Sequence, residues 1–183
     1  FNNTEHAANL FGLKEFGNIY SRLTNPTVGI LENRLTELED GAMCVALSSG
    51  TSAVMYSLIN IMSQGDNFVT ANQLYGGTYT MFDNILPEYG ITGKKVDITD
   101  LAAVEEAIDD KTRAIYCETI TNPGLVVADL EALSKIAHSK GIPLIVDATF
   151  TTSAILKPFE FGADIVVYSL TKWMSGHGRV IAG

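Results

Sequence analysis

Apolar residues along the chain follow two different spacings, and the two alternate. From the pair Asn25-Pro26 to Gly41 they recur every three or four residues, which predicts a helix. The Asn side chain would cap the first free N–H groups, Pro suits the first helical turn, and Gly ends the helix. The same spacing predicts further helices at residues 52–63, 78–86, 101–108 and 130–137.

Between these helices the apolar residues come in short unbroken runs, which are typical of strands buried on both faces. Such runs predict strands at residues 43–47, 68–70, 95–97, 113–118, 143–147 and 164–168. Strands that alternate with helices are joined by right-handed crossovers. We therefore expect an α/β fold with a mostly parallel sheet covered by helices on both faces.

Composition narrows the possible functions. The chain has 183 residues, 46% of them hydrophobic and 18% charged, which argues against disorder and allows one domain with a real core. Its formal net charge of −9 makes it a poor partner for nucleic acid, whose binding depends on cations. We find neither a membrane-length apolar run nor a signal peptide, so we expect a cytoplasmic protein.

Cysteine, histidine and the chain ends carry weaker signals. Cys44 and Cys117 lie in apolar runs and are expected to be small hydrophobic side chains without a disulfide. The three histidines lack metal-ligand spacing, so no metal site is expected. The chain starts at Phe1 without a Met and stops at Gly183 inside an apolar run, so we expect a fragment of a longer polypeptide.

Candidate chemistry follows the predicted strands, because ligands of an open α/β sheet sit beyond the carboxyl ends of its strands. The segment Ser48–Thr51 opens a helix, where free N–H groups and the helix dipole suit a phosphate. Simple helix capping explains the same residues. The sheet alone would allow a nucleotide-binding domain, but neither a Walker loop nor G-x-G-x-x-G is present.

Three further features follow later strands. Leu74–Tyr79 puts aromatic rings beside two glycines, which suits either a lid over a flat ligand or an ordinary turn. Asp147 leaves a buried strand, where a carboxylate is costly unless paired. Lys172, flanked by Ser169 and Thr171, is either a nucleophilic amine or a surface lysine. Together these are the parts of a pyridoxal phosphate site, in which the lysine forms a Schiff base and the acid keeps the pyridine nitrogen protonated.

Ordered motifs extend this interpretation along the whole chain. They are Tyr20–Thr27, Ser49–Ala53, Leu74–Tyr79, Glu118–Pro123, Val146–Phe150, and Ser169–Trp173 with Gly176–Gly178. The chain resembles the Cys/Met-metabolism family of pyridoxal-phosphate-dependent enzymes, most of all its O-acetylhomoserine sulfhydrylase subgroup. The resemblance implies an aspartate-aminotransferase-like fold of type I. Residues 25–183 would be its cofactor-binding large domain, with a mostly parallel mixed sheet, residues 1–24 would reach a neighbouring subunit, and the C-terminal small domain would be absent.

The resemblance also implies residue roles. Lys172 would carry the Schiff base and move protons, Asp147 would pair with the pyridine nitrogen, and Tyr75 would stack on the ring. Active sites shared between chains would make the enzyme a homodimer or homotetramer. Further cofactor contacts would come from Ser49, Gly50, Thr51, Asn122, Ser169 and Thr171, and from Tyr20 and Arg22 of a neighbouring subunit.

The reaction expected from this resemblance is a γ-replacement. A sulfur nucleophile would displace the acyloxy group of an O-acylhomoserine, as in homocysteine or methionine synthesis. Methionine γ-lyase, cystathionine γ-lyase and cystathionine γ-synthase activities stay open, as does a non-catalytic fragment, because much of the substrate pocket would lie in the absent domain.

Overall fold

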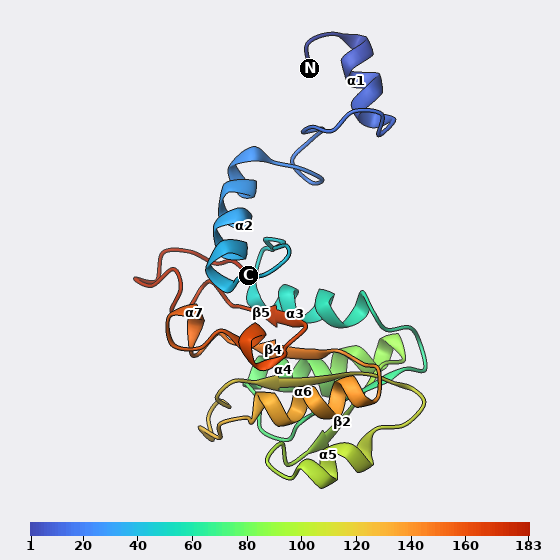
Figure 1. The fold of residues 1–183 in the computed structure, drawn as a ribbon, viewed down its shortest axis with the longest axis vertical. Helices are drawn as coiled ribbons and strands as arrows, with labels where there is room; N and C mark the ends of the chain where they lie inside the picture. Colours follow the sequence, from blue (N-terminus) through green and yellow to red (C-terminus); the bar gives the residue numbers. More distant parts are fainter. The chain divides into compact units, whose positions relative to one another are not determined.

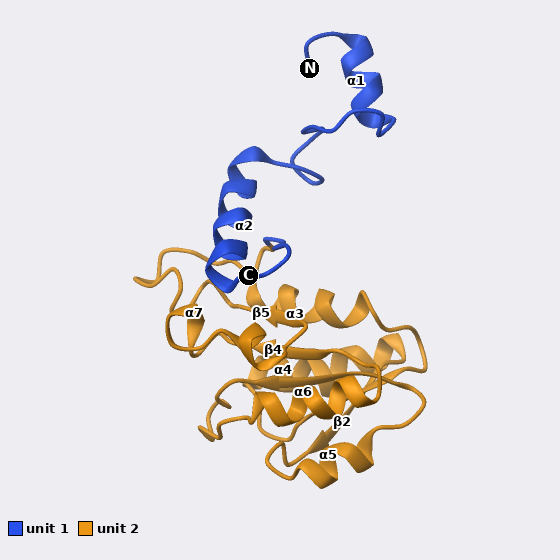
Figure 2. Ribbon diagram, viewed as in Figure 1, with its two compact units in different colours: residues 1–46 blue, residues 47–183 orange.

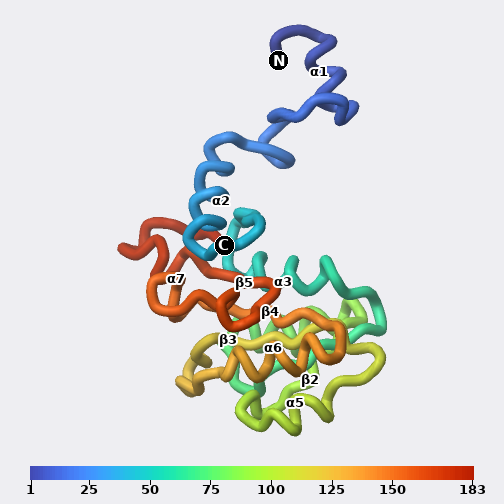
Figure 3. The backbone as a smooth tube through the Cα atoms, in the orientation of Figure 1, coloured from blue at the N-terminus to red at the C-terminus, as the bar shows by residue number.

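The structure is a computed structural model that describes residues 1–183 (Figures 1 and 3). The chain divides into two compact units, residues 1–46 and residues 47–183 (Figure 2). The first unit contains α1 (Thr4–Phe11) and α2 (Pro26–Glu39). Each unit is described by itself.

Helix α2 confirms the prediction made from its apolar spacing. The Asn25 side chain accepts hydrogen bonds from the backbone N–H groups of Thr27 and Val28, as a helix cap does. The helix ends at Glu39, and the residue that caps it is Asp40, in the left-handed conformation with φ 54°, one residue before the expected Gly41.

The predicted strand at residues 43–47 is wrong. Only Leu47 exchanges backbone hydrogen bonds with another segment, donating to Gly183 at 2.7 Å and accepting from it at 2.9 Å. The backbone N–H of Ala46 instead donates to the Glu32 carboxylate at 2.8 Å. A strand needs a ladder of main-chain partners along its length, which an apolar run alone does not supply.

The second unit is built on a five-stranded sheet with the order β2-β1-β3-β4-β5. Every pairing in it is parallel, as the alternation of strands and helices predicts. Register places Glu118 beside Asp147, and Asp147 beside Val167, so these carboxyl ends lie at one edge. The strands are β1 (Asn67–Ala71), β2 (Thr92–Val96), β3 (Thr112–Glu118), β4 (Leu144–Asp147) and β5 (Ile165–Val167).

Helices cover both faces of this sheet (Figure 1). Helix α3 (Gly50–Ile59) packs with α4 (Gly76–Thr80), and α5 (Leu101–Ala107) packs with α6 (Leu130–Ser139). The helix predicted at residues 52–63 starts earlier than expected, because Ser49 caps it, and it ends earlier, at Ile59. The remaining turns are a π-helical turn (Met81–Ile85), a 3₁₀ turn (Leu86–Tyr89), α7 (Thr152–Ile155) and a 3₁₀ turn (Pro158–Phe161).

The core lies between the sheet and its helices. Phe68, Phe82 and Tyr116 are fully buried there and meet edge to face, with ring centroids 4.7 and 5.1 Å apart. Rings in this geometry stabilise a core beyond the area they bury. No helix of the structure has the length and apolar character needed to cross a membrane.

Candidate active site

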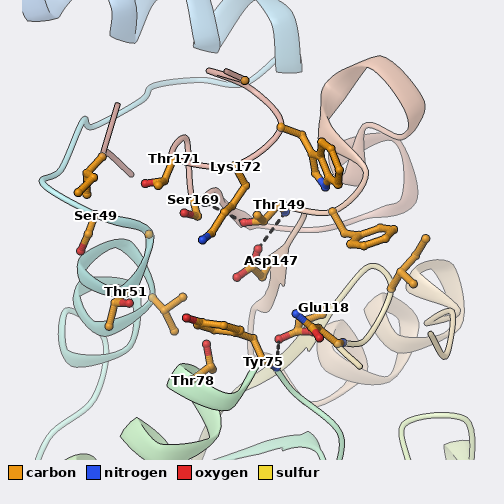
Figure 4. Close-up of a pocket in the computed structure, with 18 of the residues that line it drawn as sticks. Ser49, Thr51, Tyr75, Thr78, Glu118, Asp147, Thr149, Ser169, Thr171 and Lys172 are labelled. Carbon is orange, nitrogen blue, oxygen red and sulfur yellow. Dashed lines mark hydrogen bonds between the residues drawn. The ribbon is translucent and has the colours of Figure 1, made fainter. Parts of the chain in front are cut away.

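A cavity of about 650 Å³ opens at the carboxyl edge of the sheet (Figure 4). The segments after β3, β4 and β5 line it, together with the first residues of α3 and the residue before α4. It contains every predicted site residue of the second unit: Ser49, Gly50, Thr51, Tyr75, Asn122, Asp147, Ser169, Thr171 and Lys172.

Tyr20 and Arg22, the other two predicted site residues, belong to the first unit. The Arg22 guanidinium hydrogen-bonds to the Tyr20 hydroxyl and lies 5.1 Å from the centre of its ring. Both side chains are exposed. Their predicted contact with a neighbouring subunit stays a prediction.

One wall of the cavity is suited to an anion. The Ser49 hydroxyl accepts a hydrogen bond from the backbone N–H of Ser52 at 3.1 Å and so begins α3. Gly50 comes so close to the next wall that a Cβ there would lie 2.4 Å from the Ser169 Cβ. Glycine therefore lets the free N–H groups of α3 lie beside the Ser169 and Thr171 hydroxyls, a set that suits a phosphate.

A chain of hydrogen bonds connects this wall to the floor. The backbone N–H of Ser169 donates to the Thr149 hydroxyl at 2.7 Å, and the backbone N–H of Thr149 donates to the Asp147 carboxylate at 2.9 Å. Thr149 was not singled out in the sequence. Its signal was its place two residues after an aspartate, where an Asx turn forms.

Asp147 forms the floor of the cavity beneath Lys172 (Figure 4). Removal from water raises the pKa of its carboxyl group, and a hydrogen bond from the backbone N–H of Thr149 opposes that rise. The Tyr116 hydroxyl lies 3.4 Å from the second carboxylate oxygen. No basic side chain forms an ion pair with Asp147. The site therefore offers a desolvated carboxylate that lacks a cation.

Lys172 and Tyr75 face the same space (Figure 4). The Lys172 amine makes neither an ion pair nor a side-chain hydrogen bond, although its backbone N–H is fixed by the Ser169 carbonyl at 3.1 Å. Tyr75 is 47% exposed and lines the cavity, so its ring can contact a ligand. A free amine and an open aromatic face are both needed to hold a flat aldehyde.

Glu118 is a site residue whose part the sequence did not reveal. Its carboxylate is only 5% exposed and accepts hydrogen bonds from the backbone N–H groups of Tyr75 at 2.7 Å and Asn122 at 2.9 Å. Burial raises its pKa to about 7, while these two hydrogen bonds oppose the rise. Like Asp147, it is an acid at the end of a buried strand, and that was the available signal.

These residues fit four parts of pyridoxal phosphate: the aldehyde, the ring nitrogen, the phosphate and the face of the ring. Lys172 offers an unpaired amine to the aldehyde, and Asp147 offers a partly buried carboxylate to a protonated ring nitrogen. The start of α3 and the hydroxyls of Ser169 and Thr171 offer donors to the phosphate. Tyr75 offers a face to the ring.

Comparison with known proteins supports a pyridoxal phosphate site. The family described as Cys/Met metabolism PLP-dependent enzyme matches residues 1–183. A sulfhydrylase named FUB7 from Fusarium oxysporum f. sp. lycopersici is 50% identical, and an O-acetyl-L-homoserine sulfhydrylase from Leptospira meyeri is 48% identical. Both matches cover 100% of this chain but only 42% and 41% of those proteins, so the chain spans less than half of their length.

A solved structure is similar over the same extent. It is a putative O-acetylhomoserine (thiol)-lyase from Campylobacter jejuni that contains N′-pyridoxyl-lysine-5′-monophosphate. Its TM-score is 0.95 at 43% identity, with 100% of this chain and 45% of that chain covered. The family match along the whole chain and the cavity at the sheet edge lead to one conclusion: the chain belongs to the Cys/Met-metabolism family of PLP-dependent enzymes.

Proposed function

We propose that this chain is the cofactor-binding part of a pyridoxal-phosphate-dependent enzyme that replaces the γ-acyloxy group of an O-acylhomoserine with a sulfur nucleophile. The observation that carries the proposal is the pairing, in one cavity, of the unpartnered Lys172 amine with the desolvated Asp147 carboxylate. The sulfhydrylase names of the relatives support the choice of reaction.

Each part of the cavity has its own task in this reaction. Bound pyridoxal phosphate supplies an electron sink for the negative charge that develops on a substrate carbon. Asp147 would hold the proton on the ring nitrogen and so maintain that sink. Lys172 Nζ would remove one proton from the substrate Cα and one from Cβ, and would return one to each carbon after the acyloxy group has left and the sulfur nucleophile has bonded to Cγ. Tyr75 would lie against the ring, and the start of α3 would hold the phosphate.

The remaining predictions on assembly belong to the same proposal. Tyr20 and Arg22, both exposed, would reach the phosphate of a neighbouring subunit, where a guanidinium pairs well with a dianion. The enzyme would then be a homodimer or homotetramer with shared sites. We place it in the cytoplasm, in the synthesis of sulfur amino acids.

Absorbance and chemical trapping test the cofactor part of the proposal. Pyridoxal phosphate is added to the protein, the visible absorbance is recorded, and borohydride followed by peptide mass mapping locates the attached group. We expect the label on Lys172. The Lys172→Ala variant should lose it, whereas Lys135→Ala, which removes an exposed lysine paired with Glu131, should keep it. A label elsewhere, or none, would refute the assignment.

Product analysis tests the reaction. The holoenzyme is given O-acetylhomoserine with sulfide, and amino acids and 2-oxo acids are measured together. Homocysteine as the main product supports γ-replacement. A 2-oxo acid with released ammonia, unchanged by added sulfide, would instead show elimination and refute the proposed reaction while leaving the cofactor site in place.

A further inference from the structure

Two loops that carry ring-facing residues meet above the end of β3. Tyr75 follows β1, and Asn122 follows β3. The loops touch directly, because a Cβ built on Gly124 would lie 1.6 Å from the side-chain oxygen of Gln73. Whatever holds these two loops together therefore also sets the distance between Tyr75 and Asn122.

Glu118 lies where the two loops meet. One carboxylate oxygen accepts from the backbone N–H of Tyr75 at 2.7 Å, and the other accepts from that of Asn122 at 2.9 Å. Neither backbone N–H has another partner. A buried carboxylate that accepts two amide hydrogen bonds is far more directional than apolar packing, because both donors lose a partner if either oxygen moves.

We propose that Glu118 is a positioning residue that clamps the Tyr75 and Asn122 loops against each other, and thereby sets how tightly and in which orientation the cavity holds the pyridoxal phosphate ring. The inference rests on the proposed function, since it assigns Glu118 a role toward that cofactor. Glu118 acts through the two loops, because each of its carboxylate oxygens accepts a hydrogen bond from a backbone N–H of one loop.

The clamp is strongest in the charged form. A neutral carboxylic acid carries a proton on one oxygen, which makes that oxygen a weaker acceptor for the backbone N–H that it faces. The titratable groups that interact electrostatically with Glu118 are Asp147 on β4 and Tyr116 and Cys117 on β3, and Lys172 lines the same cavity. Since burial raises the pKa of Glu118 to about 7, the clamp should tighten as pH rises through neutrality.

Glu118→Gln tests the clamp with almost no change in size. Its amide nitrogen would face one of the two N–H donors, leaving a buried donor without an acceptor. We expect the Kd for pyridoxal phosphate to rise by about 10- to 100-fold, in line with the usual loss for such a donor. The circular dichroism of bound cofactor, relative to its absorbance, should change because the ring sits differently. The matched control is Thr119→Val, which removes a buried hydroxyl one residue away that bonds to Thr151 and lies outside the cavity lining.

The pH profile separates positioning from general weakening. Wild-type affinity should increase with pH near 7, and Glu118→Gln should lack this step while Thr119→Val keeps it. An affinity within twofold of wild type, an unchanged dichroism and an unchanged pH step in Glu118→Gln would overturn the clamp. A loss of affinity in Thr119→Val equal to that in Glu118→Gln would also overturn it. If the wild-type protein itself failed to bind pyridoxal phosphate, the proposed function would fall, and the clamp with it.

Discussion

Adding one methyl group at Gly50 should damage both folding and cofactor binding. A Cβ at this position would lie 2.4 Å from the Ser169 Cβ and 2.6 Å from the Ser169 Cα. Comfortable carbon–carbon contacts begin near ~3.5 Å, so the two segments would have to separate by about 1 Å. Ser169 cannot retreat freely, because its backbone N–H is bonded to the Thr149 hydroxyl at 2.7 Å.

The size of the effect follows from which atoms collide. Overpacking usually costs ~1–3 kcal/mol, and side-chain rotation often absorbs part of it. At Gly50 the clash involves the backbone carbon and the Cβ of Ser169, which no rotation moves. We therefore expect Gly50→Ala to lose about 3 kcal/mol of unfolding free energy, which corresponds to a drop of roughly 5–10 °C in Tm.

The Gly50→Ala substitution should lower the affinity for the cofactor as well as the unfolding free energy. Separating α3 from the turn at Ser169 moves the N–H donors of the helix away from the hydroxyls that complete the anion site. If 2–3 kcal/mol of strain opposes binding, affinity drops by about 30- to 150-fold. Thermal unfolding with and without cofactor, together with titration of pyridoxal phosphate, measures both quantities.

Gly76→Ala is the matched control, because a Cβ at that position meets nothing within 4 Å. It should change neither quantity appreciably. A Gly50→Ala protein that melted within 2 °C of wild type, or bound pyridoxal phosphate within about threefold of wild type, would show that the Cβ is accommodated without a clash, since overpacking of this kind costs ~1 kcal/mol or more.

Three shorter predictions use the acids and the buried thiol. Asp147→Asn should bind pyridoxal phosphate but lose at least ~100-fold in kcat, because a neutral amide cannot hold the ring proton; steady-state kinetics measures this. Cys117 is fully buried and its pKa is raised, so native protein should resist alkylation there until it unfolds, as peptide mass mapping would report. Burial raises the pKa of Glu118 from its usual 4.5 to about 7, so between these pH values the folded state keeps a proton that the unfolded state has lost. The apoprotein should lose up to ~3 kcal/mol of unfolding free energy as pH rises through that range, and Glu118→Gln should flatten the urea-melt profile.

The parallel sheet could be predicted because its strands are buried on both faces. The run from Arg113 to Glu118 lies in the centre of the sheet, and its apolar residues report that burial directly. The run from Met43 to Leu47 has the same character but forms no strand. Hydrophobicity reports burial, whereas strand formation also needs a neighbour with free main-chain groups, and the local sequence does not contain that information.

The cavity was predictable to the same extent and for the same reason. Asp147 ends one predicted strand and Lys172 follows another, and the carboxyl edge of a parallel sheet gathers such residues. The parts of Glu118 and Thr149 were not predictable. The Glu118–Tyr75 hydrogen bond joins residues 43 positions apart, and it exists because β1 lies beside β3 in the strand order. A sequence pattern predicts that strands exist, but it does not give their order.

Glu118 and Asp147 lie at the same edge of the sheet but have different partners. They lie opposite each other in register at the ends of β3 and β4, and burial raises the pKa of both. The Glu118 carboxylate accepts hydrogen bonds from two backbone N–H groups, whereas the Asp147 carboxylate forms no ion pair with a basic side chain. Two desolvated carboxylates side by side repel each other, and a cationic ring nitrogen at Asp147 would relieve that repulsion. The positive charge of such a ring therefore lowers the electrostatic free energy of both carboxylates, although the ring contacts only Asp147. Both carboxylates thus contribute to its affinity.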